Sequence, residues 1–76
     1  MYKLKFNFNA TPPLHLEHIE DIEEYFYWEL EEGSWREIYR KVSINDNTIS
    51  GYIIYELDYA ENIDMLLIER DDLELT

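Results

Sequence analysis

The sequence predicts an α+β fold in which a single helix packs on a small antiparallel sheet, in the order β-α-β-β-β. Three observations lead to this prediction: strict alternation of apolar and polar residues at the N-terminus, a helical repeat of apolar residues after it, and β-rich sequence beyond Gly33. A helix on one face of a sheet is the economical two-layer arrangement for these elements. We expect residues 1–76 to form one domain, because a chain of this length supports a single compact core.

Residues 2–9 are predicted to form the first strand, because apolar and polar side chains alternate along them. The apolar face comprises Tyr2, Leu4, Phe6 and Phe8. The strand should end at the following Ala-Thr-Pro-Pro sequence, in which Thr11 can cap a helix and proline fits a first helical turn.

Residues 14–32 are predicted to form the helix. Five apolar residues fall within an arc of about 120° at 100° per residue, which indicates one buried stripe. The stripe comprises Leu16, Ile19, Ile22, Phe26 and Leu30. Gly33 is the residue expected just beyond the C-terminus of this helix.

Residues 35–44 and 48–59 are predicted to form a hairpin of two strands. The turn between them falls at residues 45–47, where Asn and Asp tolerate the left-handed conformation. Both strands should extend the sheet begun by the first strand.

The sequence beyond the hairpin is less regular. A turn is predicted at residues 60–62. Residues 63–70 fit both strand alternation and helical spacing, and we favour a strand because the preceding segments form a meander. Residues 71–76 are expected to be a frayed acidic tail.

Negative charge is concentrated in two blocks of the chain, whose net charge is −12. Residues 17–32 carry eight carboxylates without any Lys or Arg, and residues 56–76 carry eight carboxylates against Arg70 alone. Because such charge repels itself and lowers stability, we expect it to serve a partner with a positively charged groove. An anionic surface argues against direct binding to nucleic acid or to membranes, which are both negatively charged.

The composition also indicates where the protein acts. The absence of cysteine excludes disulfides and thiolate metal sites, and it fits a reducing cytoplasm. The N-terminal residues alternate in polarity and do not form the apolar segment of a secretory signal. No apolar run approaches the roughly 18 residues that span a bilayer. We therefore expect a cytoplasmic protein, either monomeric or a small homo-oligomer.

Motifs for metal binding or catalysis are weak. His15 and His18 could share one side of a helix with Glu17 or Asp21, but zinc usually takes three or four protein ligands, so a structural pair of histidines is favoured. A calcium loop at the hairpin turn fails because the required glutamate position is Leu57. We expect no catalytic residue, metal or cofactor, and a small acidic metal-binding protein is only the third alternative.

The candidate site is an aromatic and acidic surface on the helix. Trp28 and Tyr25 are predicted to lie opposite the buried stripe, where carboxylates surround them. Trp and Tyr dominate interface hot spots, and the acids would meet Lys or Arg of a partner. The alternative is that the fourth strand or the tail covers Trp28. The predicted partner-binding residues are Asp21, Glu24, Tyr25, Trp28, Glu29, Glu31 and Glu32.

In size, charge, lack of cysteine and aromatic residues among carboxylates, the whole chain resembles small acidic phage-encoded inhibitors that mimic nucleic acid. Anti-CRISPR, anti-restriction and uracil-DNA glycosylase inhibitor proteins are of this kind. The resemblance lies in overall character and transfers no functional residue. It implies a non-enzymatic inhibitor that binds the basic nucleic-acid-binding groove of an enzyme or effector complex in a host cytoplasm. The alternative is an acidic interaction domain of antitoxin or immunity type that neutralises a basic toxin.

Overall fold

The computed structural model describes residues 1–59, 61 and 63–76. Over these residues the chain forms a four-stranded antiparallel sheet and two helices in the order β-α-β-β-α-β. The elements are β1 (Tyr2–Ala10), α1 (Leu14–Glu29), β2 (Trp35–Asn45), β3 (Thr48–Leu57), α2 (Ile63–Glu69) and β4 (Leu73–Leu75). The predicted α+β class and antiparallel sheet are confirmed, whereas the prediction of a single helix is wrong.

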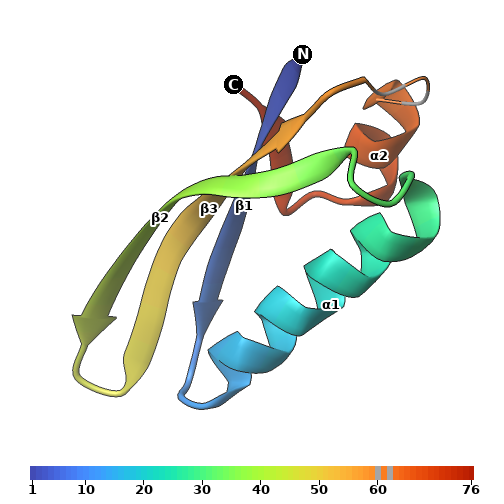
Figure 1. Ribbon diagram of the computed structural model, residues 1–76. Coiled ribbons are helices and arrows are strands. Elements are labelled where there is room, and N and C mark those ends of the chain that lie inside the picture. The colour runs from blue at the N-terminus through green and yellow to red at the C-terminus, as the bar shows by residue number, and fades with distance from the viewer. Residues whose placement is uncertain (60, 62) are drawn as a thin grey trace.

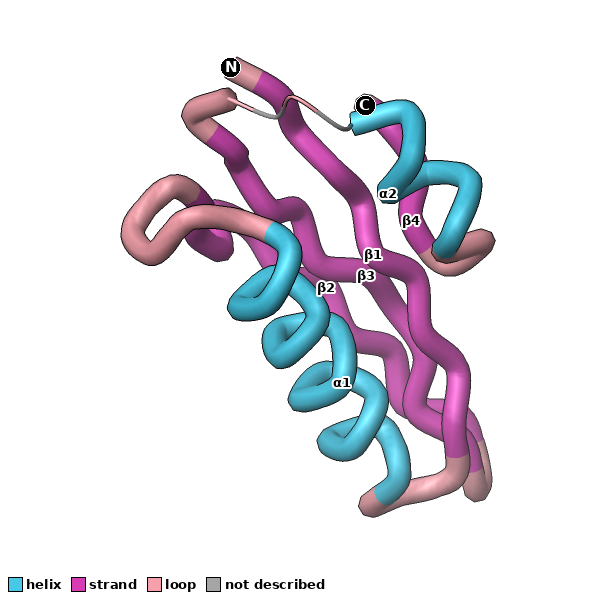
Figure 2. Tube along the Cα trace, turned by 90° about the vertical axis from the view of Figure 1, so that its right-hand side faces the viewer, coloured by secondary structure: helices cyan, strands magenta, loops and turns pink. Residues whose placement is uncertain are grey.

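Both helices lie on the same side of the sheet (Figure 1), whose strand order is β2-β3-β1-β4. Phe6 of β1 stands opposite Ile53 of β3 on one side and Leu73 of β4 on the other, so the apolar positions of three strands share one face. Figure 2 shows α1 running along this face and α2 beside β4.

One buried apolar cluster holds the two layers together. It comprises Leu4, Phe6, Phe8, Ile19, Ile22, Phe26, Ile53, Tyr55, Leu57, Leu66 and Leu73. Leu16, which the sequence places in the buried stripe, is half exposed, as is Leu14 beside it in the first turn of α1.

The ends of α1 differ from the prediction. The helix stops at Glu29, and Leu30 is extended, with its amide donating to the Phe26 carbonyl. Gly33 does adopt a left-handed conformation, at φ 81°, but inside the turn that follows rather than directly after the helix. At the other end Thr11 does not cap the helix through its side chain, and its carbonyl instead accepts the Leu14 amide.

Residues 63–69 form α2 rather than the predicted strand. Ile63, Leu66 and Leu67 all pack against the core, which a helix allows at this spacing and a strand does not. The predicted turn at residues 60–62 includes two residues outside the described part of the chain.

The C-terminal segment is ordered in the sheet and is not a frayed tail. Leu73 and Leu75 stand opposite Phe6 and Leu4, and the Thr76 amide donates to the Lys3 carbonyl. β4 therefore pairs with part of the edge that β1 would otherwise expose, which the charge-rich sequence of this segment does not reveal.

The β2–β3 hairpin forms as predicted, with an added bulge between Glu37 and Tyr39. The bulge shifts the alternation of β2, so Glu37 and Arg40 lie on the same face and form two hydrogen bonds of 3.0 and 2.7 Å. Gly51 is required further along, because a Cβ atom there would collide with the Lys41 carbonyl oxygen.

Candidate partner-binding face

The outer side of α1 carries a row of exposed carboxylates. At 100° per residue, five residues fall within an arc of about 100° on the side away from Ile22, which is fully buried. We call them the acidic face: Glu17, Glu20, Asp21, Glu24 and Trp28. The regular helix fixes their spacing, so the face is a property of the backbone and not of a mobile loop.

Trp28 is 74% exposed and lies at the C-terminal end of this surface, one turn beyond Glu24. Its ring meets the ring of Tyr27, also exposed, edge to face with 5.5 Å between centroids. No described residue covers the pair, so the structure favours the exposed position predicted for Trp28 over the alternative in which the C-terminal segment buries it. Two adjacent exposed aromatic rings are the type of residue that anchors interfaces.

Tyr25 does not belong to the acidic face, contrary to the prediction. It is half buried and packs against the core, and its hydroxyl donates to the Glu69 carboxylate at 2.9 Å. The Arg70 guanidinium lies 5.0 Å from the centroid of its ring. Burial, then the hydrogen bond to Glu69, raise the pKa of Tyr25 well above its ordinary value. Tyr25 therefore joins α1 to α2.

The two acidic blocks differ in how their charge is used. In the second block, carboxylates of four residues form ion pairs, with Arg36, Arg70 or Lys5. These residues are Glu56, Asp58, Asp72 and Glu74. Much of the second block is thus neutralised inside the fold.

The first block is left almost free of cations. Among the described residues Asp21 alone has an ion pair, with Arg70 at 2.9 Å. The Glu23 and Glu31 carboxylates accept hydrogen bonds from the Tyr55 and Tyr59 hydroxyls. The remaining carboxylates of the block are exposed and have no described hydrogen-bond partner. The exposed carboxylates of α1 are therefore mostly without a partner among the described residues.

Glu29 and Glu31 lie away from the acidic face, at the rim of a hollow of about 220 Å³ between the end of α1 and α2. Its lining combines apolar, acidic and aromatic side chains and comprises Glu29, Leu30, Glu31, Ser34, Tyr59, Glu61, Met65 and Leu66. Glu32 is exposed in the turn beside it. The predicted set of site residues is thus divided between a helix face and a hollow.

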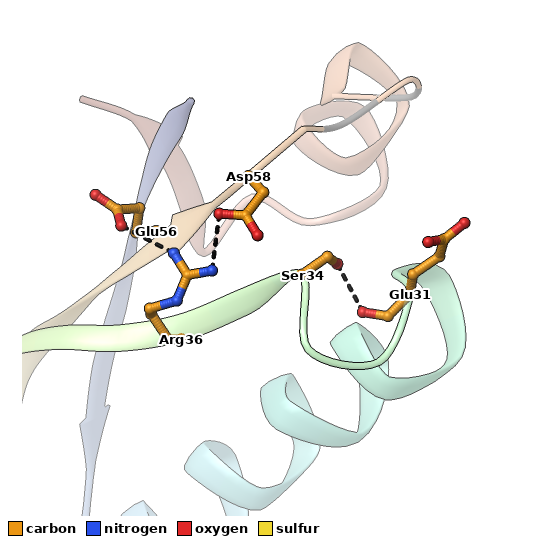
Figure 3. Close-up of polar contacts among 5 residues, drawn as sticks. All are labelled: Glu31, Ser34, Arg36, Glu56 and Asp58. Carbon is orange, nitrogen blue, oxygen red and sulfur yellow. Dashed lines mark hydrogen bonds and ion pairs between the residues drawn. The ribbon is translucent and has the colours of Figure 1, made fainter.

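The turn that carries Glu31 is held by a chain of polar contacts (Figure 3). Buried Ser34 donates its hydroxyl to the Glu31 carbonyl at 2.6 Å, and the Ser34 carbonyl accepts the Asp58 amide at 2.9 Å. Arg36 binds Asp58 at 2.7 Å and Glu56 at 2.9 Å. These contacts fix the position of the Glu31 backbone relative to β2 and β3.

Positive charge gathers on the opposite face of the sheet. The register places Lys3, Arg36 and Lys41 on the side without helices, and Lys5 lies 4.4 Å over the Tyr52 ring on that same side. This sheet face therefore holds most of the cations, but it also holds Glu56 and Glu74, which form ion pairs with Arg36 and Lys5.

The described residues contain no group of three or more His, Cys, Asp or Glu side chains arranged to hold a metal ion. His18 lines a small hollow beside Asp72, and His15 has a buried Nδ1 atom without a hydrogen-bond partner in the described part of the chain. Within that part, no helix is long and apolar enough to cross a membrane.

Comparisons with protein families, with curated proteins and with solved structures found no match to this chain. Its function is therefore inferred from the geometry of the site. Sequence reasoning misses Tyr27 and Tyr59 in that geometry. Tyr27 could be found from its position next to Trp28, whereas Tyr59 meets Glu31 only through the tertiary fold.

Proposed function

We propose that this chain is a non-enzymatic inhibitor that occupies the basic nucleic-acid-binding groove of an enzyme or effector complex as a mimic of nucleic acid. The observation that carries the proposal is the acidic face, where exposed and mostly unpaired carboxylates lie along a regular helix with exposed Trp28 at its C-terminal end. Lys and Arg side chains that line such a groove would meet these carboxylates, and Trp28 would provide an apolar contact beside them.

The spacing of the acidic face supports mimicry. Between Glu17 and Glu24 the helix rises about 10.5 Å at 1.5 Å per residue. The four carboxylates of the acidic face in this stretch are spaced unevenly, by about 4.5, 1.5 and 4.5 Å along the axis. Their mean spacing is about 3.5 Å, against about 3.4 Å per phosphate along one DNA strand. A groove that binds along a phosphate backbone would meet these carboxylates at a mean spacing close to that of the phosphates.

The distribution of charge favours one side of the protein for binding a basic partner. At an ionic strength of 0.15 M, charges are screened over about 8 Å, so a basic groove responds mainly to the nearest layer of the protein. The acidic layer of α1 would attract such a groove, and the sheet face, where cations and carboxylates are paired, would attract it less. The partner should therefore dock on the helix side, in the host cytoplasm if the chain is phage-encoded.

Affinity capture followed by a competition assay tests this proposal. Proteins captured from host extract at low salt and released by high salt are identified, and each candidate is purified with its nucleic-acid substrate. The inhibitor should raise the apparent Kd of the partner for nucleic acid in proportion to its own concentration, while the inhibitor alone shifts neither DNA nor RNA. Binding that leaves the affinity for nucleic acid unchanged would contradict mimicry and favour an antitoxin or immunity role.

A further inference from the structure

We propose that the hollow between the end of α1 and α2 receives an arginine side chain of the basic partner, next to the contact made by the acidic face. This inference rests on the proposed function, because it names a second contact in the same interface. The hollow could take such a side chain for reasons of size, lining and rigidity, which are independent of the acidic face.

The size of the hollow suits one side chain. Its volume is about 220 Å³. Pockets that bind drug-sized ligands or cofactors usually enclose about 300–1,000 Å³. A single long side chain that enters from a docked surface is therefore a better match than a free small molecule.

The lining offers apolar, acidic and aromatic groups that can contact the different parts of an arginine side chain. Leu30, Leu66 and Met65 offer apolar surface to the methylene stem, as long cationic side chains commonly use. The carboxylates of Glu29 and Glu31 stand at the rim, and neither forms an ion pair with a described residue. The half-exposed Tyr59 ring adds a flat surface on which a planar guanidinium can stack, and an ammonium gains less from it.

The wall of the hollow is already in place. Ser34 fixes the Glu31 backbone, and the Tyr59 hydroxyl donates to the Glu31 carboxylate (Figure 3 shows the Ser34 contact). That hydrogen bond raises the pKa of Tyr59 above its ordinary value of about 10, which already keeps the hydroxyl protonated as a donor at neutral pH. The second oxygen of Glu31 remains available. A rim held in this way loses little conformational freedom when an arginine binds.

Titration of the whole protein with N-acetyl-argininamide tests the inference without the partner. The chain has two methionines, Met1 and Met65, and only Met65 lines the hollow, so their methyl signals in NMR spectra give a probe and an internal reference. The Met65 methyl shift should saturate at millimolar arginine derivative, while Met1 moves little. N-acetyl-citrullinamide, which has the same shape without charge, should cause no saturable shift, and N-acetyl-lysinamide should bind at least threefold more weakly.

Two variants locate the binding. Glu31→Gln should weaken arginine binding at least threefold, and Asp71→Asn, which removes the same charge from an exposed residue outside both the hollow and the acidic face, should leave it unchanged. Thermal melts confirm that both variants are folded. Equal shifts of Met1 and Met65, or equal losses in the two variants, would overturn the inference by showing only diffuse attraction to an anionic protein. That result would leave the acidic face untouched, because inhibition by the acidic face is measured with the partner.

Discussion

Arg70, directly after α2, reaches Asp21 on α1, with 2.9 Å between its Nη2 atom and the Asp21 Oδ2 atom. The same guanidinium forms two hydrogen bonds to Asp72, of 3.1 and 2.7 Å, and lies over the Tyr25 ring. One cation therefore connects α1, α2 and the turn that leads into β4. This connection also explains why Asp21 is the one member of the acidic face with an ion pair among the described residues.

Arg70→Ala should destabilise the fold by about 1–3 kcal/mol, because it leaves the partly buried Asp72 carboxylate without its two hydrogen bonds. Arg36→Ala is the matched control: it removes the same charge and also breaks two ion pairs, but the side chain of Arg36 is 41% exposed against 18% for Arg70. We expect a smaller loss there, because ion pairs of exposed side chains contribute little. Urea unfolding of both variants measures the difference, and equal losses would contradict the connecting role of Arg70.

Substitutions in α2 distinguish the helix from the strand that the sequence favours. Leu66 is 2% exposed and Ile68 is 83% exposed, although a strand would place them on the same face. Leu66→Ala should cost about 2–5 kcal/mol of stability, and Ile68→Ala should stay within about 0.5 kcal/mol. Thermal melts measure the loss of stability in both variants. Comparable losses at Leu66 and Ile68 would favour a strand over a helix for this segment.

Stability should decline at alkaline pH through Tyr55. This residue is fully buried and its hydroxyl donates to Glu23 at 2.9 Å. Burial, then the bond to Glu23 and its charge, raise the pKa of Tyr55 far above the ordinary value. Because the folded-state pKa is the higher one, the contribution is complete below pH of about 10 and is lost as pH rises beyond it, where the unfolded chain ionises first.

Tyr55→Phe should lose about 1–3 kcal/mol at neutral pH, because Glu23 loses its donor, and should show a shallower alkaline decline. Tyr27→Phe serves as the control, since that hydroxyl has no hydrogen-bond partner in the described residues and is exposed. Unfolding free energies measured between pH 7 and pH 11 make the comparison. An unchanged alkaline slope in Tyr55→Phe would count against this account.

Trp28→Ala separates binding from folding. The exposed ring should contribute within about 0.5 kcal/mol to stability, yet its loss should weaken partner binding by about 2 kcal/mol or more, as for hot-spot aromatics. Ile22→Ala should instead cost about 2–5 kcal/mol of stability, because Ile22 is fully buried. One melt and one binding titration per variant suffice. If Trp28→Ala melts as early as Ile22→Ala, Trp28 belongs to the core.

The parts of the fold that the sequence predicts correctly have long periodic patterns. β1 alternates over nine residues, and α1 repeats its apolar positions over four turns, so a single competing residue does not change the interpretation. The seven residues of α2 are too few for that, and both patterns fit them. β4 is fixed by its pairing with Leu4 and Phe6, far away in the sequence, and so has no local signal.

The candidate site is predictable to a similar extent. Helical spacing correctly places Trp28, Asp21 and Glu24 on the outer side of α1, because that side depends only on the helix. Tyr25 is misplaced because its surroundings come from Arg70, which is distant in the sequence. The sequence also does not show which acidic block has more carboxylates in ion pairs, because the pairing with Arg36 and Lys5 arises from strand register.

We propose that partner binding depends on the acidic face of α1 and not on the net charge of the protein as a whole. Glu20→Lys with Glu24→Lys reverses this face, and Asp64→Lys with Asp71→Lys reverses exposed acids of the second block that have no ion pair among the described residues. Each pair changes the net charge by four, from −12 to −8. In a binding titration with the captured partner, we expect the Glu20/Glu24 reversal to lower the affinity at least tenfold. The Asp64/Asp71 reversal should lower it less than threefold. Equal losses for the two pairs, or a larger loss for the second block, would contradict this proposal.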